Sequence, residues 1–127
     1  MIKIAFASKD GILVNQHFGW CETFYIYEMD ENTATLVSQQ DASQKYEDEV
    51  EKLIYKIESL DNSDIVYVLQ IGPKAANMVK KVGIYPMKSA HEEEKIEDVI
   101  ASLQNLMRGE SPLWLKRIVM RRGSKDA

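Results

Sequence analysis

The chain has 127 residues, of which 45% are hydrophobic and 28% are charged, so it is long enough for one domain with its own core. It carries 16 basic and 20 acidic side chains, and the formal net charge of −4 argues against a general nucleic-acid binder. One cysteine and two histidines exclude an internal disulfide and a four-ligand Cys/His zinc site within one chain.

The first part of the chain predicts three strands. Residues 2–7 are mostly apolar, and residues 23–29 are rich in aromatic and β-branched side chains, as strands usually are. A short turn at 30–32 leads into residues 33–39, where apolar and polar side chains alternate. We expect these three strands to form an antiparallel meander.

The second part of the chain predicts three helices and two further strands. The first helix has apolar residues at the spacing of one buried stripe, namely Tyr46, Val50, Leu53, Ile54, Ile57 and Leu60. Residues 65–69 form an apolar run typical of a strand buried on both faces, and residues 84–87 predict the last strand. The second helix is expected to begin after Gly72 and to end near Gly83, and the third lies within 96–106.

The resulting order, β-β-β-α-β-α-β-α, restricts the topology of the sheet. Strands joined through helices run parallel, so the fourth and fifth strands should be parallel to each other, and the fourth can pair with the first. This arrangement resembles the ribonuclease-H-like strand order 3-2-1-4-5. We therefore expect an α/β fold with a mixed five-stranded sheet and helices packed on it.

The segment at residues 8–22 is far longer than the roughly 2–5 residues of a hairpin loop, and long ordered loops tend to be functional. Because it follows the first strand, it should share the carboxyl edge of the sheet with the loops at 71–74 and 88–91. Ligands commonly bind at this edge of an open α/β sheet. The sequence therefore predicts a site where these three loops converge.

Several chemical roles stay open for the residues of these loops. His17 is compatible with a metal ligand, an acid–base group or a histidine that fills the core. Cys21 is compatible with a thiolate ligand or a small buried side chain, and His91 with a ligand or a solvated helix start. Gly72 precedes a helix whose free N–H groups suit an anion, although any loop-to-helix turn uses similar residues.

Sequence motifs of common catalytic sites are absent. The chain contains no Walker, GxSxG or HExxH sequence. Ribonuclease-H chemistry needs carboxylates clustered on the sheet to hold two metal ions, and the predicted first and fourth strands supply none. A hydrolase or nuclease of this fold is the alternative to a binding protein, and clustered carboxylates at the sheet end would distinguish the two.

Charge is distributed unevenly along the chain. Residues 1–107 carry 10 basic and 18 acidic side chains, whereas residues 108–127 carry six basic and two acidic ones. Such a basic segment can be a partner-docking arm, a phosphate contact or a solvated end, and we interpret it as a solvated end because chain termini are commonly disordered. We accordingly divide the chain into a domain at 1–107, which carries the site predicted at the converging loops, and a basic tail at 108–127.

The sequence predicts no membrane segment. No apolar run approaches the roughly 20 residues of a membrane span, and the apolar start at residues 1–7 is too short for a signal sequence. A single cysteine suits a reducing compartment. We expect a cytoplasmic location with no membrane or nucleic-acid partner, and the oligomeric state is left open.

Seven segments carry a family resemblance. In chain order they are residues 4–11 (IAFASKDG), 15–19 (NQHFG), 24–28 (FYIYE), 71–76 (IGPKAA), 83–86 (GIYP), 96–99 (IEDV) and 111–116 (SPLWLK). Together they resemble the NifX/NafY family, the dinitrogenase iron–molybdenum cofactor biosynthesis domain, over nearly the whole chain. The His-Phe-Gly loop is the most specific element. No radical-SAM cysteine motif is present, so we expect a stand-alone domain of the NifX type.

The resemblance implies a ribonuclease-H-like fold and a non-catalytic role in nitrogen fixation. Members of the family bind iron–sulfur precursors of the nitrogenase cofactor, such as the NifB product or a later intermediate. They pass these precursors to a NifEN-type scaffold or to apo-dinitrogenase. We therefore expect an iron–sulfur carrier or store, and a regulatory interaction module without a cluster, whose basic tail contacts a partner, is a further alternative.

The expected metal ligand is His17, because it occupies the position of the histidine that is implicated in cluster binding by the family. Cys21 is an optional second ligand, and His91 is a third candidate. An anionic cluster needs positive charge nearby, and Lys9, Lys74 and Lys88 all lie in the three loops. The expected cofactor-binding residues are His17, Cys21, Ser8, Lys9, Asn15, Phe18, Gly19, Gly72 and Lys74.

Overall fold

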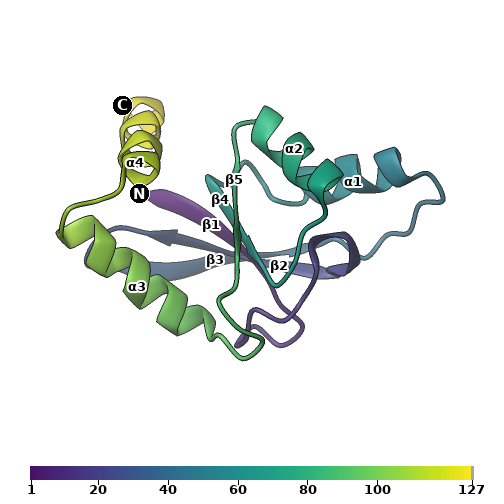
Figure 1. Cartoon of the computed structure of the whole chain (residues 1–127), viewed down its shortest axis with the longest axis horizontal. Helices are drawn as coiled ribbons and strands as arrows, with labels where there is room; N and C mark the ends of the chain where they lie inside the picture. The colour runs from purple at the N-terminus through teal and green to yellow at the C-terminus, as the bar shows by residue number, and fades with distance from the viewer. Residues whose placement is uncertain (127) are drawn as a thin grey trace.

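The computed structural model describes residues 1–126, with side chains described through residue 123. Within this range one sheet contains β1 (Ile2–Ala7), β2 (Thr23–Met29), β3 (Ala34–Asp41), β4 (Ile65–Val68) and β5 (Tyr85–Lys88). The α-helices are α1 (Glu49–Glu58), α2 (Pro73–Lys81), α3 (Ile96–Arg108) and α4 (Leu113–Asp126). A short 3-10 helix, η1 (Phe18–Trp20), lies in the long loop after β1 (Figure 1).

The sheet has the predicted order β3-β2-β1-β4-β5. β1 pairs antiparallel with β2 and parallel with β4, and β5 lies parallel to β4. β2 also pairs antiparallel with β3, so β1, β2 and β3 form the expected meander. The predicted α/β fold class and strand order are thus confirmed, with β3 and β5 at the two edges of the sheet.

Helices cover both faces of the sheet and bury two hydrophobic cores. α1 and α2 lie on one side and α3 on the other (Figure 1). Successive side chains of a strand alternate between faces, so Ala5 and Ala7 join the core under α1 and α2, whereas Ile4 and Phe6 join the core under α3 and α4. All residues of β4 are buried, as the sequence predicts for a strand covered on both faces.

α1 differs from the prediction in its start and in its buried face. The Asp48 side chain caps the helix, which therefore begins after Tyr46 rather than at it. Within the predicted stripe Val50 and Ile54 are exposed, and Lys56 is buried instead. The Lys56 ammonium donates hydrogen bonds to two backbone carbonyls, and these bonds hold that side of α1 against the rest of the chain.

α4 is a helix that the sequence analysis does not predict. Leu115 and Ile118 are buried in the same core as α3, and Arg122 Nε lies 2.9 Å from a carboxylate oxygen of buried Asp64. The interpretation of this segment as a solvated end is therefore wrong for its described part. Basic residues separate the apolar ones along 113–122, so hydrophobic spacing does not indicate the apolar stripe of this helix that packs against the sheet.

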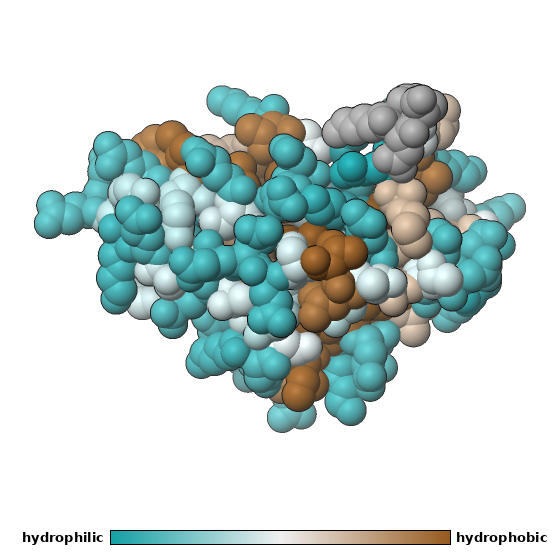
Figure 2. Space-filling view, turned by 180° about the vertical axis from the view of Figure 1, so that it is seen from behind, coloured by the Kyte–Doolittle hydropathy of each residue, from teal (hydrophilic) through white to brown (hydrophobic). Residues whose placement is uncertain are grey.

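The described part of the chain contains no helix with both the length and the apolar character needed to cross a membrane. Seen from behind, the surface is mainly hydrophilic, and hydrophobic side chains gather in a band near the middle (Figure 2). Trp20 in η1 and Met120 in α4 have the highest exposed fractions of the large apolar side chains, 79% and 73%. The most exposed apolar side chains thus come from separate elements.

Candidate functional site

The three loops predicted to converge lie at one edge of the sheet. β1, β4 and β5 are parallel, so the segments that follow them leave from the same edge. The long loop (8–22) is hydrogen-bonded to the segment between β4 and α2 and to the segment between β5 and α3. The Phe18 N–H donates to the Gln70 carbonyl at 2.8 Å, and the Val14 N–H donates to the Glu94 carbonyl at 2.9 Å. The predicted convergence is therefore confirmed at the level of the backbone.

Two residues expected to bind cofactor instead make hydrogen bonds that shape the long loop. The hydroxyl of buried Ser8 accepts a hydrogen bond from the Gly11 N–H at 2.9 Å. The amide oxygen of Asn15 accepts one from the Lys9 N–H at 2.8 Å. A pocket lies where His17 meets the start of α2, and Ser8, Lys9 and Asn15 do not line it.

The first turn of the long loop depends on Asp10 and Gly11. Backbone hydrogen bonds from Leu13 at 3.0 Å and Ile12 at 2.9 Å hold the pKa of the Asp10 carboxyl below its ordinary value of 3.8. Gly11 has a φ of +75°, and a Cβ atom there would lie 2.8 Å from the Tyr25 ring. A glycine is required at this position both for the backbone conformation and for the close approach of Tyr25.

A pocket of about 260 Å³ lies between η1, α1 and the start of α2. Five of the predicted binding residues line it: His17, Phe18, Gly19, Gly72 and Lys74. The structure therefore brings together the middle of the long loop and the turn after β4. Trp20, Gln70, Ile71 and Pro73 line the same pocket.

His17 presents an exposed side chain from a fixed backbone. His17 forms an isolated parallel β-bridge with Gln70, and the His17 carbonyl accepts a hydrogen bond from the Trp20 N–H at 3.1 Å. The next residue, Phe18, is fully buried and packs against the Phe24 ring at a centroid distance of 5.8 Å. Burial of Phe18 thus anchors the loop while the His17 imidazole stays open to solvent.

Positive charge borders the pocket on two sides. Lys74 lies in the first turn of α2, a turn without acidic residues whose N-cap, Gly72, has no side-chain hydrogen bond. The free N–H groups and dipole of a helix start add partial positive charge there. On the other side Lys52 Nζ, on a half-buried side chain, lies 3.1 Å from the exposed Glu49 carboxylate in an ion pair of α1.

Lys52 and Glu49 are pocket residues that the sequence analysis missed. They come from α1, and no spacing or motif in the sequence indicates that this helix packs beside the long loop. A Cβ atom at Gly19 would lie 3.7 Å from Lys52 Nζ, an ordinary contact distance, so the approach of Lys52 to the long loop does not depend on a glycine there. The contribution of α1 therefore follows from tertiary packing alone.

Cys21 lies in the core and does not line the pocket. It is fully buried, and its thiol donates a hydrogen bond to the Thr23 carbonyl at 3.0 Å. Burial raises the pKa of this thiol from 9.0 to about 11, so it is protonated at neutral pH. A protonated core thiol is a poor metal ligand, because the thiolate is the ligating form.

The raised pKa of Cys21 predicts a loss of stability in alkali. The folded-state pKa lies above the unfolded value, so the contribution of the thiol is complete below pH 9 and is lost as the pH rises to 11. By pH 11 the wild type should lose about 2 kcal/mol of unfolding free energy more than Cys21→Ala does. Denaturant unfolding of both proteins under reducing conditions across this range measures the difference. Identical pH profiles would contradict the assignment.

The other expected ligands and lysines are not at the pocket. His91 is exposed and its Nδ1 accepts a hydrogen bond from the Glu93 N–H at 3.3 Å. Lys88 is exposed at the end of β5 and does not line the pocket either. Within residues 1–123, whose side chains are described, no three His, Cys, Asp or Glu side chains are grouped so that they could hold a metal ion. The pocket thus contains His17 but neither Cys21 nor His91.

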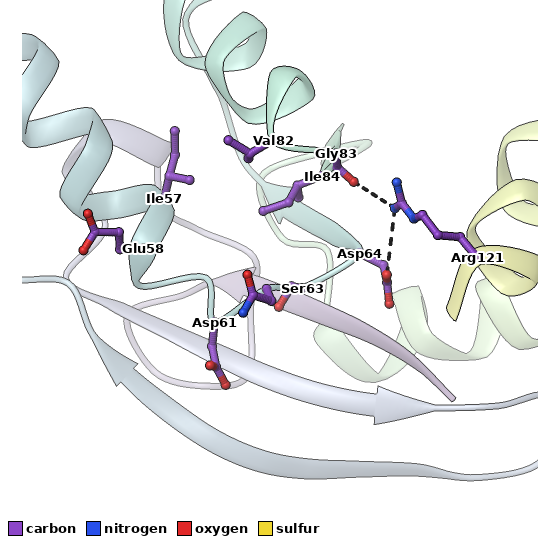
Figure 3. Close-up of a pocket in the computed structure, with 10 residues that line it drawn as sticks. Ile57, Glu58, Asp61, Ser63, Asp64, Val82, Gly83, Ile84 and Arg121 are labelled. Carbon is purple, nitrogen blue, oxygen red and sulfur yellow. Dashed lines mark hydrogen bonds and ion pairs between the residues drawn. The ribbon is translucent and has the colours of Figure 1, made fainter. Parts of the chain in front are cut away.

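A larger hollow, of about 380 Å³, lies at the other end of the parallel strands, where β4 and β5 begin (Figure 3). Arg121 on its wall is already engaged: its guanidinium donates to the Gly83 carbonyl at 2.8 Å and lies 3.9 Å from Asp64. Asp64 immediately precedes β4, and Gly83 lies just before β5. These contacts attach α4 to the sheet, so we assign this region a structural role.

Curated relatives match the chain over most of its length. The family model described as dinitrogenase iron-molybdenum cofactor matches residues 1–106. NifX of Azotobacter vinelandii is 33% identical, over 99% of this chain and 80% of that protein. NifX of Herbaspirillum seropedicae is 32% identical, over 94% of this chain and 83% of that protein. NifY of Azotobacter vinelandii is 28% identical, and the match spans only 47% of its length.

Two solved structures share the fold. The crystal structure of PH0822 has a TM-score of 0.60 at 19% identity, over 82% of this chain and 89% of that one. The crystal structure of mj0327 from Methanocaldococcus jannaschii has a TM-score of 0.55 at 19% identity, over 84% and 90%. At such identities the likeness supports the fold alone. The family match over residues 1–106, together with the NifX relatives, establishes that the chain belongs to the dinitrogenase iron-molybdenum cofactor family.

Proposed function

We propose that this chain binds an iron–sulfur precursor of the nitrogenase iron–molybdenum cofactor and carries it as cargo, without acting as an enzyme. Membership of the family supports a role in the biosynthesis of that cofactor. The observation that carries the proposal of cargo binding is the exposed His17 side chain on the rim of the pocket between η1 and α2. Imidazole is a common protein ligand of iron.

The rigid backbone around His17 supports a role as ligand. Phe18 is buried directly after it, and the hydrogen bond from the Phe18 N–H to Gln70 ties the loop to the end of β4. A ligand held in position loses little conformational freedom when cargo binds. We therefore assign His17 as the primary ligand of the cargo.

The charges around the pocket suit an anionic cargo. Lys52 and Lys74 approach it from two helices, and the start of α2 adds partial positive charge. Glu49 partly offsets Lys52, but the Glu49 side chain is exposed, so solvent screens this ion pair and weakens it. An anionic cluster could displace Glu49 from Lys52 at little cost.

The small number of ligands fits a protein that must also release its cargo. Within the described residues His17 is the one histidine or cysteine that lines the pocket. A cluster with one imidazole ligand and otherwise electrostatic contacts keeps its remaining coordination positions accessible to an acceptor. On this basis we propose that the cargo comes from a NifB-type protein and passes to a NifEN-type scaffold or to apo-dinitrogenase.

The proposal predicts that His17→Ala loses the cargo. Wild type, His17→Ala and His91→Ala are incubated anaerobically with the isolated NifB product, and the iron that coelutes with each protein is measured. The wild type and His91→Ala should retain equal amounts, and His17→Ala should bind at least about tenfold more weakly, because even the residues that merely orient metal ligands have effects of this size. His91→Ala is the matched control, since it removes an exposed histidine outside the pocket.

One result would contradict the role of His17, and another would contradict the carrier function. Equal retention by wild type and His17→Ala would remove His17 from the binding site while leaving the carrier proposal in place. Absence of retention by the wild type would refute the carrier proposal itself.

A further inference from the structure

A groove of about 310 Å³ runs between the end of α2, the edge strand β5 and the helix α4. It lies at the opposite end of α2 from the pocket of His17, because Lys80 lines the groove whereas Pro73 lines the pocket. None of the residues used in the proposed function lines it.

The floor of the groove is aromatic and apolar. The Tyr85 ring from β5 and the Trp114 ring from α4 are stacked, with centroids 4.7 Å apart and an interplanar angle of 12°. Ile84 and Ile118 are buried beneath them. Stacking holds the two rings in place, so the floor is a preformed surface for an apolar side chain.

The walls of the groove carry three cations. Lys80 comes from α2, and Arg117 and Arg121 come from α4. Arg121 is held by the Gly83 carbonyl at 2.8 Å, whereas Lys80 and Arg117 are exposed and have no hydrogen-bond or ion-pair partner among the side chains described, those of residues 1–123. No described carboxylate lines the groove, although acidic side chains outnumber basic ones in the whole chain by 20 to 16.

We propose that this groove binds an acidic segment of a partner protein, with an apolar or aromatic side chain of the partner on the Tyr85–Trp114 floor. Charge complementarity carries the proposal: two unpaired cations, Lys80 and Arg117, border an apolar floor, and no described carboxylate lines the groove, although Arg121 lies 3.9 Å from Asp64 behind it. A segment with Asp or Glu beside Leu or Phe matches both features.

Other modes of binding fit the groove less well. Pro86 in the edge strand has no backbone N–H, so it discourages the addition of a partner strand along β5 and favours recognition by side chains. A nucleic acid would extend beyond the groove and meet the acidic residues that predominate in residues 1–107. A short acidic protein segment avoids that repulsion.

The location of the groove makes docking compatible with the proposed cargo. The groove and the His17 pocket lie at the two ends of α2, so a partner held at one leaves the other accessible. The inference stands apart from the proposed function, and it is tested on the protein without cargo.

The test uses fluorescence anisotropy with a labelled short peptide in which Glu and Asp alternate with Leu and Phe, and a matched peptide with Gln and Asn in place of the acids. The wild type should bind the acidic peptide at least about tenfold more tightly than the matched one. Lys80→Ala/Arg117→Ala should weaken binding of the acidic peptide about tenfold, the effect of two exposed ion pairs. Lys81→Ala/Lys116→Ala is the control, because it removes the same charge from the same helices outside the groove and should bind as the wild type does.

Four results would overturn the proposal. They are no binding of the acidic peptide by the wild type, equal binding of the two peptides, an equal loss in the control variant, and tighter binding of a single-stranded oligonucleotide than of the acidic peptide. Thermal unfolding of both double variants checks that they fold. Because every substituted side chain is exposed, their transitions should match that of the wild type.

Discussion

Replacing Asp64 with alanine is expected to lower the free energy of unfolding by about 3 to 4 kcal/mol. The carboxylate is 1% exposed and accepts hydrogen bonds from the Lys3 N–H at 2.8 Å and from Arg122 Nε at 2.9 Å. Alanine would leave the Arg122 guanidinium, whose side chain is 16% exposed, without its carboxylate partner and with the Asn62 carbonyl at 3.1 Å as its remaining acceptor. Breaking a buried ion pair costs more than the pair contributes, because the remaining charge is desolvated.

Urea unfolding followed by circular dichroism measures this loss, and Asp61→Asn provides the control. Asp61 is likewise part of an ion pair, with Lys3 Nζ at 2.8 Å, but the Asp61 side chain is 50% exposed. Asparagine tolerates the left-handed backbone at this position, where φ is +52°. The control should lose less than about 1 kcal/mol. Similar losses in the two variants would show that burial of Asp64 does not determine its importance.

Replacing Lys56 with methionine is expected to cost about 3 kcal/mol. The Lys56 ammonium donates to the carbonyls of Cys21 and Ala42, two residues that are fully buried. Burial also lowers the pKa of Lys56 below its ordinary 10.5. Methionine keeps the volume of the side chain but leaves both carbonyls without this donor, and unsatisfied buried acceptors are costly.

Lys52→Met is the matched substitution one turn earlier on α1. Lys52 is more exposed and pairs only with exposed Glu49, so its replacement should cost less than about 1 kcal/mol. Equal unfolding free energies for Lys56→Met and the wild type would contradict the role assigned to the ammonium. Such a result would mean that water or a backbone shift satisfies the two carbonyls.

The topology of the sheet could be predicted because connection lengths and hydrophobic patterns leave few arrangements. Apolar β4 indicates a strand covered on both faces, and the helices before and after it require parallel neighbours. The edge strand β3 follows from the short turn at 30–32. Each of these features depends on residues close together in the sequence.

The buried faces of α1 and α4 could not be predicted, because they depend on partners far away in the chain. Lys56 is buried through carbonyls at residues 21 and 42, and hydrophobic spacing treats any lysine as solvated. α4 is anchored partly by Arg122 on Asp64, a contact across 58 residues. A pattern of apolar residues does not contain such polar anchors.

Part of the candidate site could be predicted because the sheet topology brings particular loops together. His17, Gly19 and Lys74 follow parallel strands, so topology alone places their loops at one edge, and the pocket contains all three. Cys21 and Ser8 lie in the same long loop, yet both are buried, because a loop has an inner and an outer side that spacing does not distinguish. Lys52 was missed because it reaches the pocket from α1.

Binding of the iron–sulfur cargo by His17 is tested most directly by nuclear magnetic resonance. The signals of the imidazole nitrogens of the ¹⁵N-labelled protein are recorded with and without the cargo. The chain has two histidines, so each spectrum contains an internal control. Cargo bound through His17 should shift or broaden the His17 signals and leave those of His91 unchanged. Unchanged His17 signals in a protein that retains iron, or equal changes at both histidines, would contradict it.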